Sequence, residues 1–494
     1  MTKPEKKAFK IATATTITNY SKLYTLIVND KDVTSASLRI NYLRLIKGAS
    51  FDTSVNYLYE LLLNIMLELR KEQDIYYELF DKISKARILY EKSLYKECFN
   101  LLDKIKASAT VYENYYALLI SSRLELEYLL ALNYPETNEK ALHHKQFKVN
   151  ETLRITQKMH QQSALYELLK HRMIYKGNSR SEKQKTELND LVVSEMSIMA
   201  SSNLEGFEIN KLHQLFQANY LISVGDYKSA YHSFFELNNL LEANKHLWSN
   251  PPFYYVLTLE GVLDSLRSLH NYDGMTYYIQ QLKNLKSSSL NFNTNVVCLI
   301  FLYELFPILD SGDFLACEIH MKKYDETLLK KVNSLSLSRN AELSLNIALI
   351  HFGLKKFRKA QNILSKVIFA SRDYSYLPLY RTLRLVNLMV LYELKDFDFI
   401  KYESRSIKRE ILMAGKNYKI ERRIINFVNK QTLPAYALKR INLWEKMNKD
   451  FKTISQDVYE QQTIKHFDFL AWIESKIRRI HLSKILIEKM HSRF

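Results

Sequence analysis

Glycine and proline are scarce in this chain of 494 residues. It contains 9 glycines and 7 prolines, whereas average usage is roughly 7% and 5%. A sheet protein of this length needs more turn residues, so the scarcity favours helices joined by short loops. Alternating strand patterns are rare, and apolar residues three and four positions apart recur from Leu58 to the C-terminus. The sequence therefore predicts an all-α fold.

Cysteine is also rare, and a long apolar run is missing. Cys98, Cys298 and Cys317 lie far apart in apolar helical contexts, which indicates neither a disulfide framework nor a thiolate metal site. The most apolar run, residues 296–309, contains Glu304 and Pro307 and is shorter than the ~20 residues of a membrane span. The charged N-terminus does not resemble a signal peptide. We expect a cytoplasmic protein that does not bind membranes.

Motifs for catalysis and cofactor binding are absent from the sequence. No His-Glu-x-x-His, Gly-x-Ser-x-Gly, P-loop or Gly-x-Gly-x-x-Gly occurs. His143 and His144 are adjacent, and neighbours on a helix point in different directions, so a surface position is expected. Glu403 and Glu410 have basic neighbours, as is typical of a solvated helix face. We expect no enzyme, cofactor, metal or small-molecule substrate.

Five segments share one spacing pattern, built around an anchor residue. The anchors are Ala230, Met275, Cys317, Ala360 and Ile400, at spacings of 45, 42, 43 and 40 residues. An aromatic residue stands three positions before each anchor: Tyr227, Tyr272, Phe314, Phe357 and Phe397. A small or aliphatic residue stands twelve positions before each anchor: Ala218, Leu263, Leu305, Ala348 and Leu388. The pattern predicts two antiparallel helices joined by a turn, with the aromatic residue at the start of the second helix.

An earlier copy of the pattern surrounds Cys98, with Ala86 twelve residues before it. Its anchor lies 132 residues before Ala230, which is three intervals of 44. Only one trace of a repeat, around Ala141, is visible between the two. Whether residues 110–210 hold degenerate repeats or an insertion stays open.

Residues 210–410, and to a lesser extent residues 80–110, resemble the tetratricopeptide family. Asn346 to Ala348, Phe357, Ala360 and Leu364 carry the best match, followed by Ala218, Gly225, Tyr227, Ala230 and Phe234. The period exceeds the ~34 residues of that family, and its tryptophan and terminal proline are mostly missing. The resemblance implies a right-handed superhelix, or solenoid, of antiparallel helix pairs.

The resemblance also implies a partner-binding face. In such superhelices the first helix of each pair lines the concave surface, where asparagine and basic side chains hold peptides. Asn219 and Asn346 stand where such asparagines lie. Helix capping or hydrogen bonding between helices by a buried asparagine is the alternative.

The sequence pattern divides the chain into three regions. Residues 1–175 are expected to form irregular helical repeats, residues 190–410 the tetratricopeptide-like repeats, and residues 411–494 a basic helical region. The polar stretch from Lys176 to Lys183 has no apolar face and is expected to be an exposed loop or boundary.

Positive charge is concentrated near the C-terminus. The formal net charge is +18, and residues 401–440 hold 11 basic and 3 acidic residues. The basic candidates for partner binding are Arg405, Lys408, Arg409, Arg422 and Arg423, and Lys416 shares a helix face with the first three. Such a face attracts phosphates or an acidic protein surface. Charged runs also simply solvate helices.

Two classes of function fit these observations. The first is a scaffold or adaptor that binds a protein or peptide in the groove of a helical-repeat superhelix. The alternative is a regulatory or nucleic-acid-associated protein whose basic C-terminal helices bind phosphates. The two differ in salt response, because phosphate binding weakens steeply as salt rises. The sequence does not identify the partner.

Overall fold

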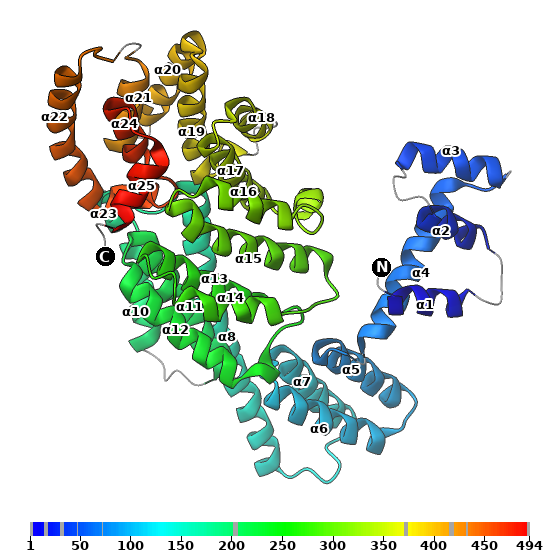
Figure 1. Ribbon diagram of the computed structural model, residues 1–494. Coiled ribbons are helices and arrows are strands. Elements are labelled where there is room, and N and C mark those ends of the chain that lie inside the picture. The colour runs from blue at the N-terminus through cyan, green and yellow to red at the C-terminus, as the bar shows by residue number, and fades with distance from the viewer. Residues whose placement is uncertain are drawn as a thin grey trace. The chain divides into compact units, whose positions relative to one another are not determined.

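The computed structural model describes residues 3–13, 18–29, 34–46, 48–71, 73–200, 206–369, 374–413, 419–430 and 433–491. Every regular element within these ranges is a helix (Figure 1). The prediction of an all-α fold is confirmed. Contacts divide the chain into two compact units, residues 1–157 (unit 1) and 158–494 (unit 2).

In its described residues, unit 1 contains seven complete helices and the start of an eighth. They are α1 (Lys3–Ala12), α2 (Asn19–Asn29), α3 (Ser35–Leu45), α4 (Phe51–Lys71), α5 (Ile75–Glu91), α6 (Tyr95–Val111), α7 (Tyr115–Ala131) and α8 (Glu139–Lys176), whose second half belongs to unit 2. The helix pair α5 and α6 buries Ala86 and Cys98 completely. These are the two small residues that the repeat pattern picks out there.

Unit 2 holds the remaining helices. They are α9 (Glu182–Thr186), α10 (Asn189–Ala200), α11 (Phe207–Val224), α12 (Tyr227–Ala243), α13 (Phe253–Ser268), α14 (Met275–Asn284), α15 (Leu290–Asp310), α16 (Phe314–Lys323), α17 (Leu337–Gly353), α18 (Phe357–Ile368), α19 (Pro378–Leu394), α20 (Phe397–Met413), α21 (Lys419–Val428), α22 (Ala437–Gln456), α23 (Val458–Ile464), α24 (Phe469–Arg478) and α25 (Leu482–His491). Two short 3-10 helices cover Lys245–Leu247 and Leu329–Ser334.

Helices α11 to α20 form five consecutive pairs whose boundaries follow the spacing pattern. Four second helices, α12, α16, α18 and α20, begin at the aromatic residue. The exception is α14, which begins at its anchor Met275, so that Tyr272 lies in the preceding turn. All five anchors and their partners twelve residues earlier are at most 1% exposed. Small and aliphatic residues therefore stand where the two helices of each pair approach each other.

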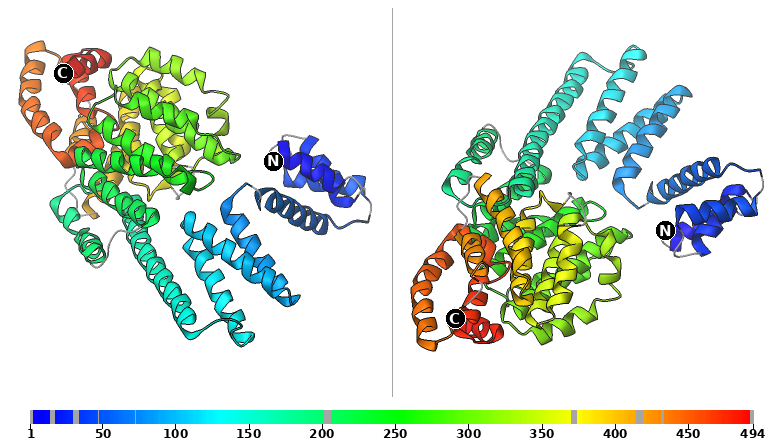
Figure 2. Two further views of the ribbon diagram at one scale, coloured as in Figure 1. Left: turned by 90° about the horizontal axis from the view of Figure 1, so that it is seen from below. Right: turned by 90° about the horizontal axis from the view of Figure 1, so that it is seen from above.

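The first helices of successive pairs also contact one another. The series α11, α13, α15, α17 and α19 packs neighbour to neighbour, and each second helix packs on the following first helix (Figures 1 and 2). Two glycines permit the closest approaches. A Cβ atom on Gly261 would lie 2.3 Å from the Phe234 ring, and one on Gly353 would lie 2.1 Å from the Phe314 ring.

The C-terminal helices pack along the ends of these pairs. A Cβ atom on Gly225, after α11, would lie 3.0 Å from Val458 of α23. A Cβ atom on Gly312, after α15, would lie 3.0 Å from Leu486 of α25. Trp472 of α24 is 1% exposed and packs at 5.6 Å, ring to ring, against Tyr392 of α19. Residues 458–491 therefore share one core with the helix pairs.

Helix α15 is the most apolar element. Among the described residues it is the one helix long and apolar enough to cross a membrane, and 67% of its most apolar window is buried in unit 2. Its neighbours α13 and α17 contact it directly. Its composition also follows from this central place in the core.

Candidate functional site

A chamber of about 1140 Å³ opens inside unit 2. The elements around it are the end of α8, the segment after it, the first turns of α17 and α19, and parts of α20, α21 and α23. Its polar lining includes Arg172, Arg180, Ser338, Glu342, Thr382, Glu410, Glu421, Gln462, Thr463 and His466. Segments more than 280 residues apart in sequence thus contribute polar groups to one cavity.

One wall of the chamber is the non-helical segment of residues 177–181, which we call the strap. The backbone N–H of Ser179 donates to the carbonyl oxygen of Ser223 at 2.7 Å. The side-chain amide of Gln462 donates to the carbonyl oxygen of Ser179 at 2.9 Å. The strap therefore ties α11 to α23 through its main chain.

Arg180 fixes the strap through its guanidinium group. One terminal nitrogen lies 3.1 Å from Glu421 and 2.6 Å from the Thr463 hydroxyl. The other lies 2.9 Å from Glu460. The side chains of Glu421 and Glu460 are 2% and 3% exposed. Charge-assisted bonds of this kind are the stronger class of hydrogen bond.

The chamber floor continues into a charged cluster on the first helices. Glu342 lines the chamber and pairs with Arg339 at 2.6 Å, and Arg339 also reaches Glu260 of α13 at 2.7 Å. Burial raises the pKa of Glu342, and the Arg339 charge opposes that shift while Glu260 adds to it. Arg339 therefore stabilises the ionised form of the Glu342 carboxylate.

Asp264 of α13 and the residues after α23 complete this cluster. Asp264 pairs with Lys465 at 2.8 Å. Burial alone would raise the pKa of Asp264, but the Lys465 ammonium lowers it. Burial together with the charges of Lys465 and Arg267 lowers the pKa of His466 to about 3. His466 is therefore neutral at physiological pH and offers a neutral imidazole to the chamber.

Asn219 and Asn346, predicted from the resemblance, both lie on first helices and are 7% and 3% exposed. The Asn219 amide donates to the Leu215 carbonyl and accepts from Lys170 at 3.2 Å. The Asn346 amide donates to the Glu342 carbonyl at 2.8 Å. Neither lines the chamber, although Asn346 stands one turn after Glu342. Asn219 thus makes the hydrogen bond between helices that the alternative describes, from α11 to Lys170 of α8, whereas the bond of Asn346 stays within α17.

The five basic candidates lie on α20 and α21. Arg405, Lys408, Arg409 and Arg422 are exposed. Within the described ranges these four make no ion pair, and only Arg423 does, with Asp450 at 2.6 Å. Lys416, predicted to share a helix face with Arg405, Lys408 and Arg409, lies outside the described residues. The four residues leave positive charge open to a partner.

Two expectations about polar residues near the chamber are wrong. The stretch from Lys176 to Lys183 is exposed only at its ends, because Ser179 is 5% exposed and the Arg180 side chain 13%. Glu403 is 4% exposed instead of solvated, and it accepts from Arg384 at 2.5 Å. In both places the charged side chain is buried because it pairs with ionic groups of other helices instead of being hydrated.

Sequence reasoning did not find Arg180, Glu421, Glu460 and Gln462. They belong to no motif, and their pairing over 240 residues or more cannot be predicted without the fold. By contrast, His143 and His144 are exposed on α8, as predicted. In the described part of the chain no three His, Cys, Asp or Glu side chains are placed to hold a metal ion.

Comparison with known proteins finds no matching family model, no matching curated protein and no matching solved structure.

Proposed function

We propose that this chain is a non-catalytic, cytoplasmic scaffold or adaptor that binds a protein or peptide. In this proposal the helix pairs form a right-handed, tetratricopeptide-like superhelix, and its concave face holds the partner. The observation that carries the proposal is the chamber of about 1140 Å³ beside the first turns of α17 and α19.

The size and lining of the chamber suit a short peptide segment. Pockets for drug-sized ligands occupy ~300–1,000 Å³, and this chamber is somewhat larger. Its polar groups suit a peptide backbone, while the stacked rings of Tyr175 and Tyr376, 5.1 Å apart, offer an apolar surface for side chains. The buried, unpaired thiols of Cys98, Cys298 and Cys317 support a reducing compartment.

Peptide selection on the full chain tests the proposal. Random peptides displayed on phage are selected against the protein and then measured against two variants. Ser338→Trp places an indole in the chamber from an exposed position of α17. Thr276→Trp makes the same change at an exposed position of α14 that does not line the chamber.

We expect the selected peptides to lose at least tenfold in affinity for Ser338→Trp and to keep it for Thr276→Trp. Equal binding to both variants would place the peptides outside the chamber and would contradict the proposal. Circular dichroism of both variants ensures that folded proteins are compared.

A second candidate function is phosphate binding by α20 and α21. The observation that favours it is the exposure of Arg405, Lys408, Arg409 and Arg422 without ion pairs among the described residues. Four such contacts to a single strand give a slope of about −3 in a plot of log affinity against log salt concentration. Changing these four residues to Glu should abolish binding to labelled single-stranded RNA. Arg423→Glu, which removes a paired arginine, serves as the milder control.

A further inference from the structure

We propose that Glu421, Glu460 and Gln462 form a recognition site for an extended peptide segment that carries an arginine. In this structure the chain's own Arg180 fills the site. The inference rests on the proposed function and names the class of ligand. Three observations carry the inference: the hydrogen bonds to the strap backbone, the hydrogen bonds to the Arg180 guanidinium, and the buried side-chain oxygen of Gln462, which has no hydrogen-bond partner among the described residues.

The strap is held as an extended peptide ligand would be held. Its main chain donates at Ser179 to Ser223 and accepts at Ser179 from Gln462. Ser181, at the end of the strap, has φ −166° and ψ 160°. The Ser223 carbonyl of α11 and the Gln462 side chain of α23 thus bind the strap backbone, and these two bonds do not involve the side chain of residue 179.

The carboxylate pair is shaped for a guanidinium. Glu421 accepts from both terminal nitrogens of Arg180, Glu460 accepts from one of them, and Thr463 accepts a further bond. Glu460 is itself held, because it accepts from the backbone N–H groups of Lys419 and Ile420 at 3.1 and 3.2 Å. A planar fork of donors fits this arrangement, and the compact ammonium of lysine does not.

Gln462 provides a second observation, separate from the Arg180 contacts, that indicates ligand binding. Its side chain is 6% exposed and lines the chamber, and its amide nitrogen binds the strap. Its amide oxygen is buried without a hydrogen-bond partner among the described residues. A buried polar atom without a partner is costly. A peptide that presents both a carbonyl oxygen and an N–H to Gln462 satisfies both ends of this amide, which the strap does not.

A buried arginine between two carboxylates is weak evidence for stability, since apolar residues of similar size often stabilise as well or better. The arrangement is better explained by recognition. A segment tethered beside its site has a high effective concentration. It therefore lowers the apparent affinity of an external peptide by the fraction of time that the site is open.

The test uses the full chain with Arg180→Gln, which vacates the guanidinium position but keeps an amide donor. The probe is a fluorescent peptide with the sequence of residues 176–182, Lys-Gly-Asn-Ser-Arg-Ser-Glu. We expect the variant to bind this peptide at least tenfold more tightly than the unmodified chain, as measured by fluorescence anisotropy. The same peptide with lysine in place of its arginine should bind at least tenfold more weakly.

Two controls locate the binding. Arg172→Gln removes an arginine that also lines the chamber but pairs with the exposed Asp190, and it should bind like the unmodified chain. Adding Glu460→Gln to Arg180→Gln should remove the preference for arginine. Equal affinities of Arg180→Gln for the arginine and lysine peptides would overturn the inference.

If Arg180→Gln does not fold, excess peptide present during refolding should restore the native circular dichroism spectrum, and failure to do so also overturns the inference. The peptides selected for the Ser338→Trp comparison need not contain arginine. Their binding in the chamber, combined with a negative result here, would leave the proposed function intact and reject only this ligand class.

Discussion

At the scale of single residues, the closest helix contacts depend on glycine. Gly261 faces the ring of Phe234, which is 1% exposed and has no room to move. We expect Gly261→Ala to lower the free energy of unfolding by about 1–3 kcal/mol, because the added methyl group overpacks the contact between α12 and α13. Chemical denaturation followed by circular dichroism measures this change.

Gly274→Ala is the matched control for this substitution. Its Cβ atom would meet only the flexible side chain of Asn271, at 3.2 Å, and its φ of −62° suits alanine. We expect a change within about 0.5 kcal/mol. Equal losses in both variants would show that the Phe234 contact is not what requires glycine.

His466 gives the chain a pH-dependent stability. Its pKa is about 3 in the folded protein, against an ordinary value of 6.5. The unfolded chain therefore binds a proton below pH 6.5 that the folded chain does not. The contribution of His466 to stability is complete above pH 6.5 and is lost as the pH falls toward 3.

We expect His466→Gln to flatten the decline of stability between pH 6.5 and 4.5, as measured by denaturation at a series of pH values. One proton sets an upper limit of about 1.4 kcal/mol per pH unit. The observed slope should be smaller, because His466 is partly exposed. Identical slopes in both proteins would mean that His466 titrates normally in the folded chain.

At the scale of elements, the sequence predicts helix pairs better than it predicts the polar contacts between them. Apolar spacing reports which faces of a helix are buried, so the turns before α12, α16, α18 and α20 fall where the aromatic residues indicate. Ala141, the one trace of a repeat in the next interval, lies in the first turn of α8. That helix is 38 residues long, which the repeat spacing does not predict.

The strap and its carboxylate partners show why the site was not predicted. A polar stretch without an apolar face is predicted to be exposed to water, because sequence spacing carries no information on partners far along the chain. The Arg180 side chain is buried by Glu421 and Glu460, which belong to α21 and α23. Contacts of α23 with α21 and with the turn after α11 bring these groups together.

Helix α24 attaches the C-terminal region to the helix pairs through Trp472. This side chain is 1% exposed, packs on Tyr392 and Phe427, and donates to Glu393 at 2.9 Å. We expect Trp472→Ala to cost about 3–5 kcal/mol. Denaturation is followed by circular dichroism, because the variant lacks the fluorescence of Trp472.

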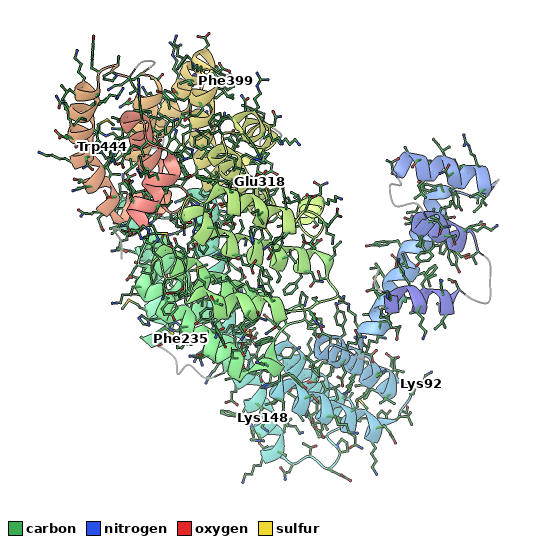
Figure 3. The ribbon with its side chains drawn as sticks, viewed as in Figure 1. Lys92, Lys148, Phe235, Glu318, Phe399 and Trp444 are labelled. Atoms are coloured by element: carbon green, nitrogen blue, oxygen red, sulfur yellow. The ribbon has the colours of Figure 1, made fainter. Side chains whose placement is uncertain are left out.

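Trp444 on α22 is the matched control (Figure 3). It is only partly buried and contacts Phe451 of its own helix at 5.7 Å. We expect Trp444→Ala to cost about 1 kcal/mol. A loss as large as that of Trp472→Ala would mean that α22 supports the core as strongly as α24 does.

At the scale of the whole molecule, the two units should unfold as separate cooperative bodies. Scanning calorimetry of the full chain should show two transitions. Leu102→Ala, at a fully buried position of unit 1, should lower one transition, and Gly261→Ala the other. A single transition that both variants shift would contradict this division.

The central claim is that the chamber of unit 2 binds a peptide. Hydrogen exchange of the full chain, with and without a peptide selected on it, tests this claim most directly. We predict slower exchange in the first turns of α17 and α19, which line the chamber. Slower exchange confined to α14, α16 or α22, with the starts of α17 and α19 unchanged, would contradict it.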